Sequence, residues 1–102
     1  MKKFLAFIIC CVMAISAYSQ VPKLKFHDGK FKILQLTDLH WVVSDSYKEK
    51  NDSTYNLIRK LIHTERPDVV IMTGDVVVSW NARKGWTRLL GLFEEEKMPF
   101  AV

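Results

Sequence analysis

Three side chains that can ligate a metal ion directly follow two apolar segments of the chain. Asp38 and His40 come after residues 31–36, and Asp75 comes after residues 68–72. In open parallel sheets, ligands bind at the carboxyl ends of the strands, so these side chains are expected to meet if the two segments are neighbouring strands. Carboxylate oxygens and an imidazole nitrogen suit Zn, Mn or Fe. The pattern therefore predicts a metal site built from Asp38, His40 and Asp75.

The same residues have a simpler interpretation as turn residues. An isolated Asp-x-His occurs by chance in many chains, and an aspartate at a strand end often hydrogen-bonds its own backbone. The metal-site interpretation gains from Gly74, which precedes Asp75 and lets the backbone turn sharply after the second segment. A polar break of this kind after each of two apolar segments favours ligation over turn formation.

The strands that would position these side chains can be delimited along the chain. A tight hairpin turn is predicted at residues 28–29, which read Asp-Gly, between the strand-like residues 23–26 and 31–36. The second half of residues 31–36 is apolar on both faces, which is typical of a strand covered on both sides. Residues 68–72 have the composition of a central strand, and residues 100–102 begin another.

Two helices are predicted between these strands. A polar loop at residues 41–50 precedes a helix that is expected to end near Glu65, because Pro67 disfavours helical geometry in the residue before it. A second helix is expected over about residues 82–97, with Trp86 in its buried stripe. The candidate N-terminal caps of the first helix are Asn51, Asp52 and Ser53.

The order of these elements predicts an α/β fold. Strand, helix, strand, helix and incipient strand make a βαβαβ unit with a parallel sheet. Such sheets are normally covered on both faces, and the last predicted strand is followed by no covering helix before Val102. We therefore expect residues 20–102 to be the truncated N-terminal part of a larger domain.

The first residues predict export. Residues 1–19 combine two lysines with an apolar run and small residues at Ala17 and Ser19, which is typical of a secretory signal peptide cleaved after one of these two residues. The apolar run is about 14 residues, whereas a membrane-spanning helix needs about 20. The mature protein is expected in the periplasm or outside the cell, with no membrane attachment.

Composition excludes several classes of protein. The chain has 102 residues with 15 Lys+Arg and 11 Asp+Glu, and loss of Lys2 and Lys3 with the leader lowers the net charge from +4 to +2. The remaining basic residues are spread along the chain, so nucleic acid is not expected as the main partner. Cys10 and Cys11 both lie in the leader, so no disulfide is expected. No glycine-rich phosphate loop is present in the sequence.

Residues 31–40 and 61–75 together resemble the calcineurin-like metallophosphoesterase superfamily, most closely its secreted branch related to purple acid phosphatases. The resemblance rests on Asp-x-His and Gly-Asp after hydrophobic strands, in this order, and on the Arg-Pro-Asp entry to the second strand. It implies an α/β/β/α sandwich, of which this chain would supply the N-terminal βαβαβ part, and a small-molecule phosphate ester as substrate.

The resemblance also implies roles for the three candidate ligands. Asp38 and His40 would ligate the first of two metal ions (Fe, Mn or Zn), and Asp75 would bridge both. A hydroxide bound by the two ions would hydrolyse phosphate mono- or diesters by in-line displacement. The family's Gly-Asn-His motif would lie beyond Val102, so the catalytic residues are expected there and residues 1–102 alone are expected to be inactive. The alternative is a noncatalytic fragment or binding module of an exported protein, and the oligomeric state is left open.

Other polar and aromatic residues have weaker functional interpretations. His27 and His63 are expected at the surface, outside the metal site, and Arg83 is expected in solvent. Trp41 either lines the substrate cleft or packs against its rim, and the sequence leaves both alternatives open. The glutamates at residues 94–96 are interpreted as a solvated patch.

Overall fold

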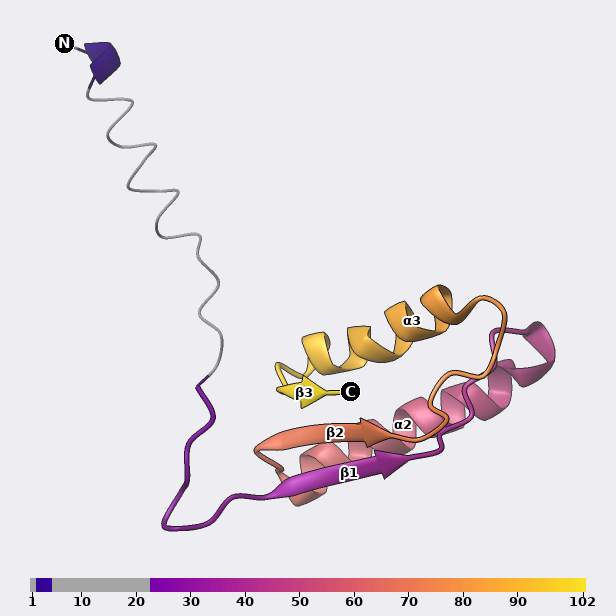
Figure 1. The fold of residues 1–102 in the computed structure, drawn as a ribbon, viewed down its shortest axis with the longest axis horizontal. Coiled ribbons are helices and arrows are strands. Elements are labelled where there is room, and N and C mark those ends of the chain that lie inside the picture. The colour runs from indigo at the N-terminus through magenta and orange to yellow at the C-terminus, as the bar shows by residue number, and fades with distance from the viewer. Residues whose placement is uncertain (1, 5–22) are drawn as a thin grey trace.

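The structure is a computed structural model that describes residues 2–4 and 23–102, and it is an α/β unit with a parallel sheet, as predicted. The predicted signal peptide, residues 1–19, lies outside the described residues apart from residues 2–4. The elements follow one another as Figure 1 shows: β1 (Ile33–Thr37), the 3-10 helix η1 (Asp45–Tyr47), α2 (Lys48–Glu65), β2 (Val69–Thr73), α3 (Ala82–Glu95) and β3 (Phe100–Ala101).

The sheet has three parallel strands in the order β1-β2-β3, so β2 is the central strand, as its composition predicted. Leu34 is paired with Val70 and Thr37 with Thr73, which brings the carboxyl ends of β1 and β2 level. β3 pairs over only two positions. Asp68 links the entries of the first two strands, since its carboxylate accepts the Lys32 N–H at 2.7 Å and its own N–H donates to the Lys32 carbonyl at 2.8 Å.

Both helices cover one face of the sheet. Leu36 is buried and Leu34 half-buried, whereas Ile33 is 52% exposed and Gln35 is exposed. The expectation that this strand is covered on both sides is therefore wrong for the described residues, because α2 and α3 pack against each other on the same side of the sheet. The most deeply buried side chains of the resulting core are Phe93, Ile58, Leu89, Leu92 and Val70.

Helix α2 ends at Glu65 as predicted but begins earlier than predicted. Arg66 adopts a left-handed conformation (φ 47°), which ends the helix before the proline. At the other end, η1 runs directly into α2, so the helix does not start at a side-chain cap. The predicted caps serve other purposes: Asn51 donates to the Val42 carbonyl at 2.7 Å, and Asp52 accepts from Lys48 at 2.7 Å.

The predicted hairpin is confirmed only at its turn. Asp28 and Gly29 both have positive φ, and His27 and Lys30 exchange backbone hydrogen bonds across them. Residues 23–26 form no strand, which corrects the prediction, because no neighbouring segment pairs with their backbone in the described part of the chain. α3 also ends at Glu95, two residues before the predicted end. No helix that the structure describes is long and apolar enough to cross a bilayer.

Candidate metal centre

The two strand exits that carry the candidate ligands are joined by backbone hydrogen bonds. The Asp38 N–H donates to the Thr73 carbonyl at 3.1 Å, and the His40 N–H donates to the Asp75 carbonyl at 3.0 Å. Parallel pairing of β1 with β2 thus continues past the ends of both strands. As a result, one ligand atom from each of Asp38, His40 and Asp75 lies within 4.8 Å of the other two. The structure brings together the three residues that the sequence singled out.

Gly74 makes this approach possible. Its φ is +71°, a left-handed conformation that glycine adopts without the steric cost of a side chain. A Cβ atom added at this position would lie 2.7 Å from Oδ1 of Asp38 and 2.8 Å from its Oδ2. The missing side chain therefore leaves room for the Asp38 carboxylate between the two strand exits.

Asp38 and His40 both have φ of 51°, which is uncommon for residues other than glycine. Such backbone conformations cost of the order of 1–3 kcal/mol and concentrate at functional sites, where the surrounding structure holds them. Here these conformations are held by the backbone hydrogen bonds that the Asp38 and His40 N–H groups donate to the segment at the end of β2. Alternating left-handed residues turn both side chains toward the Asp75 side of the sheet edge, where their ligand atoms gather.

The Asp38 carboxylate is stabilised in its charged form. The Thr37 hydroxyl donates to its Oδ2, and the Asp75 N–H donates to its Oδ1 at 3.2 Å. These two bonds, with the Thr37 bond the stronger influence, hold the pKa of Asp38 below its ordinary value. A carboxylate that stays ionised is a ready ligand for a cation. Asp38, His40 and Asp75 are all exposed, so an ion and a ligand can reach them from solvent.

The donor set fits a metal ion. It offers two carboxylates and one imidazole, a mixture of hard oxygen and borderline nitrogen ligands that accepts Zn, Mn or Fe. Thr37 is the residue of this site that the sequence analysis missed. Its only signal is its position beside Asp38, since the hydroxyl bond becomes apparent only from the side-chain geometry.

Trp41 packs behind the site and does not line a cleft at the metal centre. Its side chain is 4% exposed, and its backbone bridges Val77, with the Trp41 N–H donating to the Val76 carbonyl at 2.8 Å. Trp41 is thus largely buried, and it also borders a depression of about 420 Å³ beside α2 and α3. Gly85 of α3 approaches the same segment closely, because an added Cβ would lie 3.3 Å from the Trp41 ring and 2.8 Å from Val77.

Other residues of interest lie outside the group. His27 is exposed and lies 3.4 Å from Asp68, and His63 is exposed, as predicted. The solvated-patch interpretation of residues 94–96 is wrong for Glu96, whose side chain is 17% exposed and lies 2.6 Å from His63 and 3.1 Å from Arg59. Glu94 and Glu95 are exposed, although Glu95 also pairs with α2. Glu95 accepts from Tyr55 at 2.9 Å and from Arg59 at 2.8 Å. These contacts join the helices.

Comparison with known proteins places this geometry in a family. The family model for calcineurin-like phosphoesterases matches residues 31–102. Protein SIA1 of Kluyveromyces lactis is 40% identical over 70 residues, which is 59% of this chain and 12% of that protein. An uncharacterized Schizosaccharomyces pombe protein is 34% identical over 86 residues, 70% of this chain and 17% of the relative.

A plant protein is also similar. "Probable inactive purple acid phosphatase 29" of Arabidopsis thaliana is 29% identical over 92 residues, which covers 78% of this chain and 24% of the relative. The matched regions thus span between 12% and 24% of the lengths of these three relatives. No solved structure matches the chain. Because the family match begins just before β1 and includes all three candidate ligands, the chain belongs to the calcineurin-like phosphoesterase family.

Proposed function

We propose that this chain is part of an exported, metal-dependent phosphoesterase that hydrolyses small-molecule phosphate mono- or diesters. The observation that carries the proposal is the gathering of Asp38, His40 and Asp75 within 4.8 Å at the joined exits of β1 and β2. Family membership supports the reaction class, because the matched region contains this group.

In this proposal Asp38 and His40 hold one metal ion and Asp75 is shared with a second. Fe, Mn and Zn all suit these donors. When bound, such ions polarise a phosphoryl oxygen, make an attacking water more acidic and orient the ester. The remaining ligands of the second ion would come from other parts of the full-length protein, as would the group that assists the leaving oxygen.

The chain's own residues prepare the site for this role. Thr37 and the Asp75 N–H hold the Asp38 carboxylate in position by hydrogen bonds to its two oxygens, and these bonds lower its pKa below the ordinary value. Gly74 leaves the space that the carboxylate occupies. Exposure of the three ligands leaves an open side on which a phosphate ester can approach.

Hydrolysis of p-nitrophenyl phosphate and bis-p-nitrophenyl phosphate by the full-length protein, loaded with Mn or Zn, tests the proposal. We expect turnover of at least one ester and a loss on the order of 100-fold or more in the Asp75→Asn variant, because a removed ligand costs at least as much as a removed supporting contact. Asp28→Asn, at an exposed turn outside the site, serves as the control and is expected to keep wild-type turnover.

The second candidate is a noncatalytic metal-binding protein. It is favoured by the similarity to a plant protein whose name describes it as probably inactive. Tight metal binding without hydrolysis of either ester would support this candidate and contradict the phosphoesterase proposal.

Export is tested separately from catalysis. We expect N-terminal sequencing of the protein recovered from the periplasm or the medium to begin after Ala17 or Ser19. Recovery of a protein that retains Met1 would contradict export with cleavage.

A further inference from the structure

An open depression of about 790 Å³ lies along the N-terminal half of α3, apart from the candidate metal ligands. Four of its lining residues recur at i, i+3, i+4 and i+7 from Lys84, so they share one face of the helix. We name it the α3 pocket. The lining residues that matter for its chemistry are Trp80, Arg83, Lys84, Thr87, Arg88 and Gly91.

The α3 pocket carries cations without acidic partners. Arg83, Lys84 and Arg88 form no ion pair with any residue in the described ranges 2–4 and 23–102. Lys84 and Arg88 are four residues apart on the helix, a spacing at which like charges repel by a few tenths of a kcal/mol. An anion between them would relieve this repulsion.

Two carboxylates near these cations belong to the adjoining depression of about 420 Å³, which shares Lys84 and Arg88 with the α3 pocket. They are Asp45 and Asp52, and Asp52 already accepts a hydrogen bond from Lys48 at 2.7 Å. Glu95 lies with Arg88 and Asp52 in a third depression, of about 340 Å³, and already accepts hydrogen bonds from Tyr55 and Arg59. The lining of the α3 pocket itself contains no carboxylate, so its charge is positive.

Arg88 is held in place by an aromatic contact. Its guanidinium carbon lies 4.2 Å from the centre of the Tyr55 ring. This cation–π contact fixes the position of the guanidinium group. The N–H groups at the guanidinium edge lie in the plane of the fork and suit the oxygens of a phosphate. The contact orders Arg88 at the boundary between the α3 pocket and the depression that Tyr55 lines with Asp52 and Glu95.

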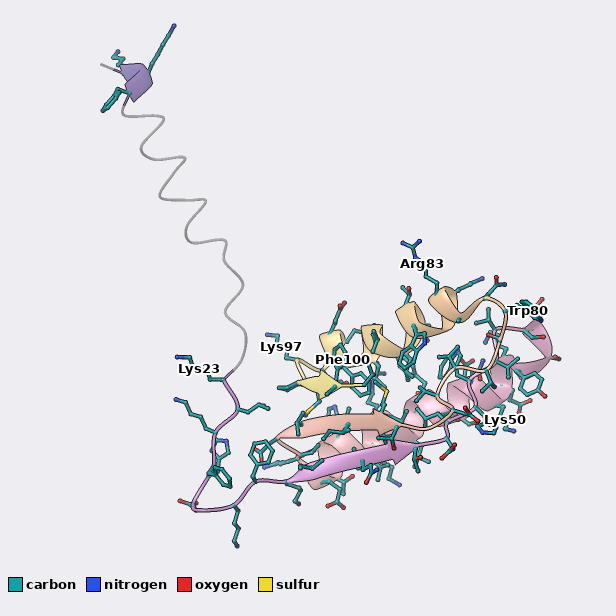
Figure 2. All side chains as sticks on the ribbon, viewed as in Figure 1. Lys23, Lys50, Trp80, Arg83, Lys97 and Phe100 are labelled. Atoms are coloured by element: carbon teal, nitrogen blue, oxygen red, sulfur yellow. The ribbon has the colours of Figure 1, made fainter. Side chains whose placement is uncertain are left out.

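Trp80 supplies a flat apolar surface at the same pocket. It is fully exposed, at 104% relative accessibility, and it lies beside the first turn of α3, near Arg83 (Figure 2). A single exposed aromatic side chain is common on protein surfaces, but this one adjoins the cations of the α3 pocket. An indole face in this position can stack on a planar ring.

The α3 pocket is an open depression with room for a ligand larger than a lone inorganic anion. About 790 Å³ falls in the range of sites for small organic ligands, 300–1,000 Å³. Gly91 keeps one end open, since a Cβ added there would meet no atom within 4 Å.

We propose that the α3 pocket binds a phosphorylated molecule with a planar ring, of the nucleotide class. Its phosphates lie against Arg83, Lys84 and Arg88, and its ring stacks on Trp80. This binding is independent of the proposed hydrolysis, because none of these residues belongs to the candidate metal centre.

Calorimetric titration of the full-length protein with ADP, pyrophosphate and adenosine tests this inference. The Asp75→Asn background and a chelator remove any contribution from the metal centre. We expect ADP to bind at least about fivefold more tightly than pyrophosphate, since stacking of a base on an aromatic side chain contributes 1–3 kcal/mol. Trp80→Ala is expected to abolish that difference. Equal affinity for ADP and pyrophosphate in the protein that retains Trp80 would overturn the proposal.

Two further variants separate a pocket from diffuse attraction. Gly91→Leu fills the open end without changing any charge, and leucine also suits a helix interior better than glycine. We expect it to weaken ADP binding about tenfold while its thermal unfolding shows an intact fold. Lys60→Gln removes an exposed α2 cation outside the pocket and is expected to leave binding unchanged. Equal weakening in Lys60→Gln, or full binding in Gly91→Leu, would contradict a defined site.

Discussion

At the scale of single residues, the candidate metal centre depends on space as much as on ligands. Asp38 occupies the volume that a side chain at position 74 would fill, and the Asp75 N–H then reaches the Asp38 carboxylate. The conformation of Gly74 and the placement of Asp38 are thus one structural feature. A substitution at Gly74 should disturb the metal site even though glycine supplies no ligand.

Gly74→Ala tests this dependence against a matched control. Gly74 and Gly29 have nearly the same φ, +71° and +72°, so alanine at either position costs about 1–2 kcal/mol in stability. At Gly29 an added Cβ meets nothing within 4 Å, whereas at Gly74 it meets the Asp38 carboxylate. Gly74→Ala should lose at least as much stability as Gly29→Ala in urea unfolding, because its Cβ also displaces the hydrogen-bonded Asp38 carboxylate, and only Gly74→Ala should lose Mn²⁺ affinity. Equal Mn²⁺ affinity in the two variants would contradict the proposed role of Gly74.

The three candidate ligands could be predicted from sequence because residue type and position suffice for that step. Asp38, His40 and Asp75 each follow an apolar strand, and parallel strands place their exits at one edge. The left-handed conformations of Asp38 and His40 and the Asp75 N–H bond to Asp38 could not be predicted, since they accompany contacts between strand exits that lie 37 residues apart in the chain. The Thr37 bond joins neighbouring residues, but it depends on the side-chain geometry that those contacts set.

At the scale of elements, α2 and α3 are joined by a polar contact at the edge of the core. The Tyr55 hydroxyl donates to Glu95 at 2.9 Å, and Arg59 donates to the same carboxylate. Burial, and then the Glu95 carboxylate, raise the pKa of Tyr55 above its ordinary value of 10.0. The neutral phenol is therefore the form that the folded state favours.

This contact predicts a loss of stability in alkali. Because the folded pKa lies above the unfolded one, the stabilisation is fully present below pH 10 and is lost as the pH rises through the folded pKa. Tyr55→Phe should lower the free energy of unfolding by about 1 kcal/mol at pH 8, the usual worth of one hydrogen bond. The free energy of unfolding of Tyr55→Phe should also fall less steeply than that of the wild type between pH 10 and pH 11. Parallel curves for the two proteins in urea unfolding would contradict this account.

The packing of α3 yields a second element-scale prediction. Gly85 and Gly91 both lie inside this helix, where alanine is favoured over glycine by about 1 kcal/mol. Gly91→Ala should gain this stability, since its Cβ meets open space. Gly85→Ala should instead be destabilised relative to Gly91→Ala by about 1–3 kcal/mol, because its Cβ lies 2.8 Å from Val77. Equal stabilisation of both variants in urea would show that α3 does not approach the Trp41 segment this closely.

Periodicity predicted the presence and type of the helices and strands better than their ends. Pro67 marked the end of α2 correctly, because its ring restricts the residue before it. The start of α2 was wrong because η1 supplies the preceding turn, so no cap residue was needed. The strand predicted at residues 23–26 was wrong because alternation alone does not provide a neighbouring strand to pair with.

At the scale of the whole molecule, protection of the backbone should follow the depth of each element in the sheet. β2 pairs on both sides, and Val70 is completely buried. Residues 23–31 are joined to the rest mainly through their own turn and a contact of His27 with Asp68. Hydrogen exchange should therefore be at least about 100-fold slower in β2 than in residues 23–31. Similar exchange in both segments would mean that the sheet does not form a stable core.

The coverage of the sheet shows what the sequence could not provide at this scale. An apolar strand indicates that both faces can be buried, but the layer that covers each face depends on the path of the whole chain. Ile33 and Gln35 lie on the face that α2 and α3 leave exposed in the described residues. The α/β class and the central position of β2 were predicted correctly, because alternating strands and helices allow few arrangements.

The most direct test of the account is Mn²⁺ binding, measured by calorimetry on the wild type, Asp38→Asn and Asp28→Asn. Asp38 and Asp28 are exposed aspartates with φ of 51° and 52°, so the two substitutions make the same chemical change in the same backbone conformation. Of these two aspartates, only Asp38 belongs to the group of candidate ligands that includes His40 and Asp75. We expect Asp38→Asn to bind Mn²⁺ on the order of 100-fold more weakly than wild type and Asp28→Asn to bind as wild type does. Equal Mn²⁺ affinities in all three proteins would contradict the metal centre.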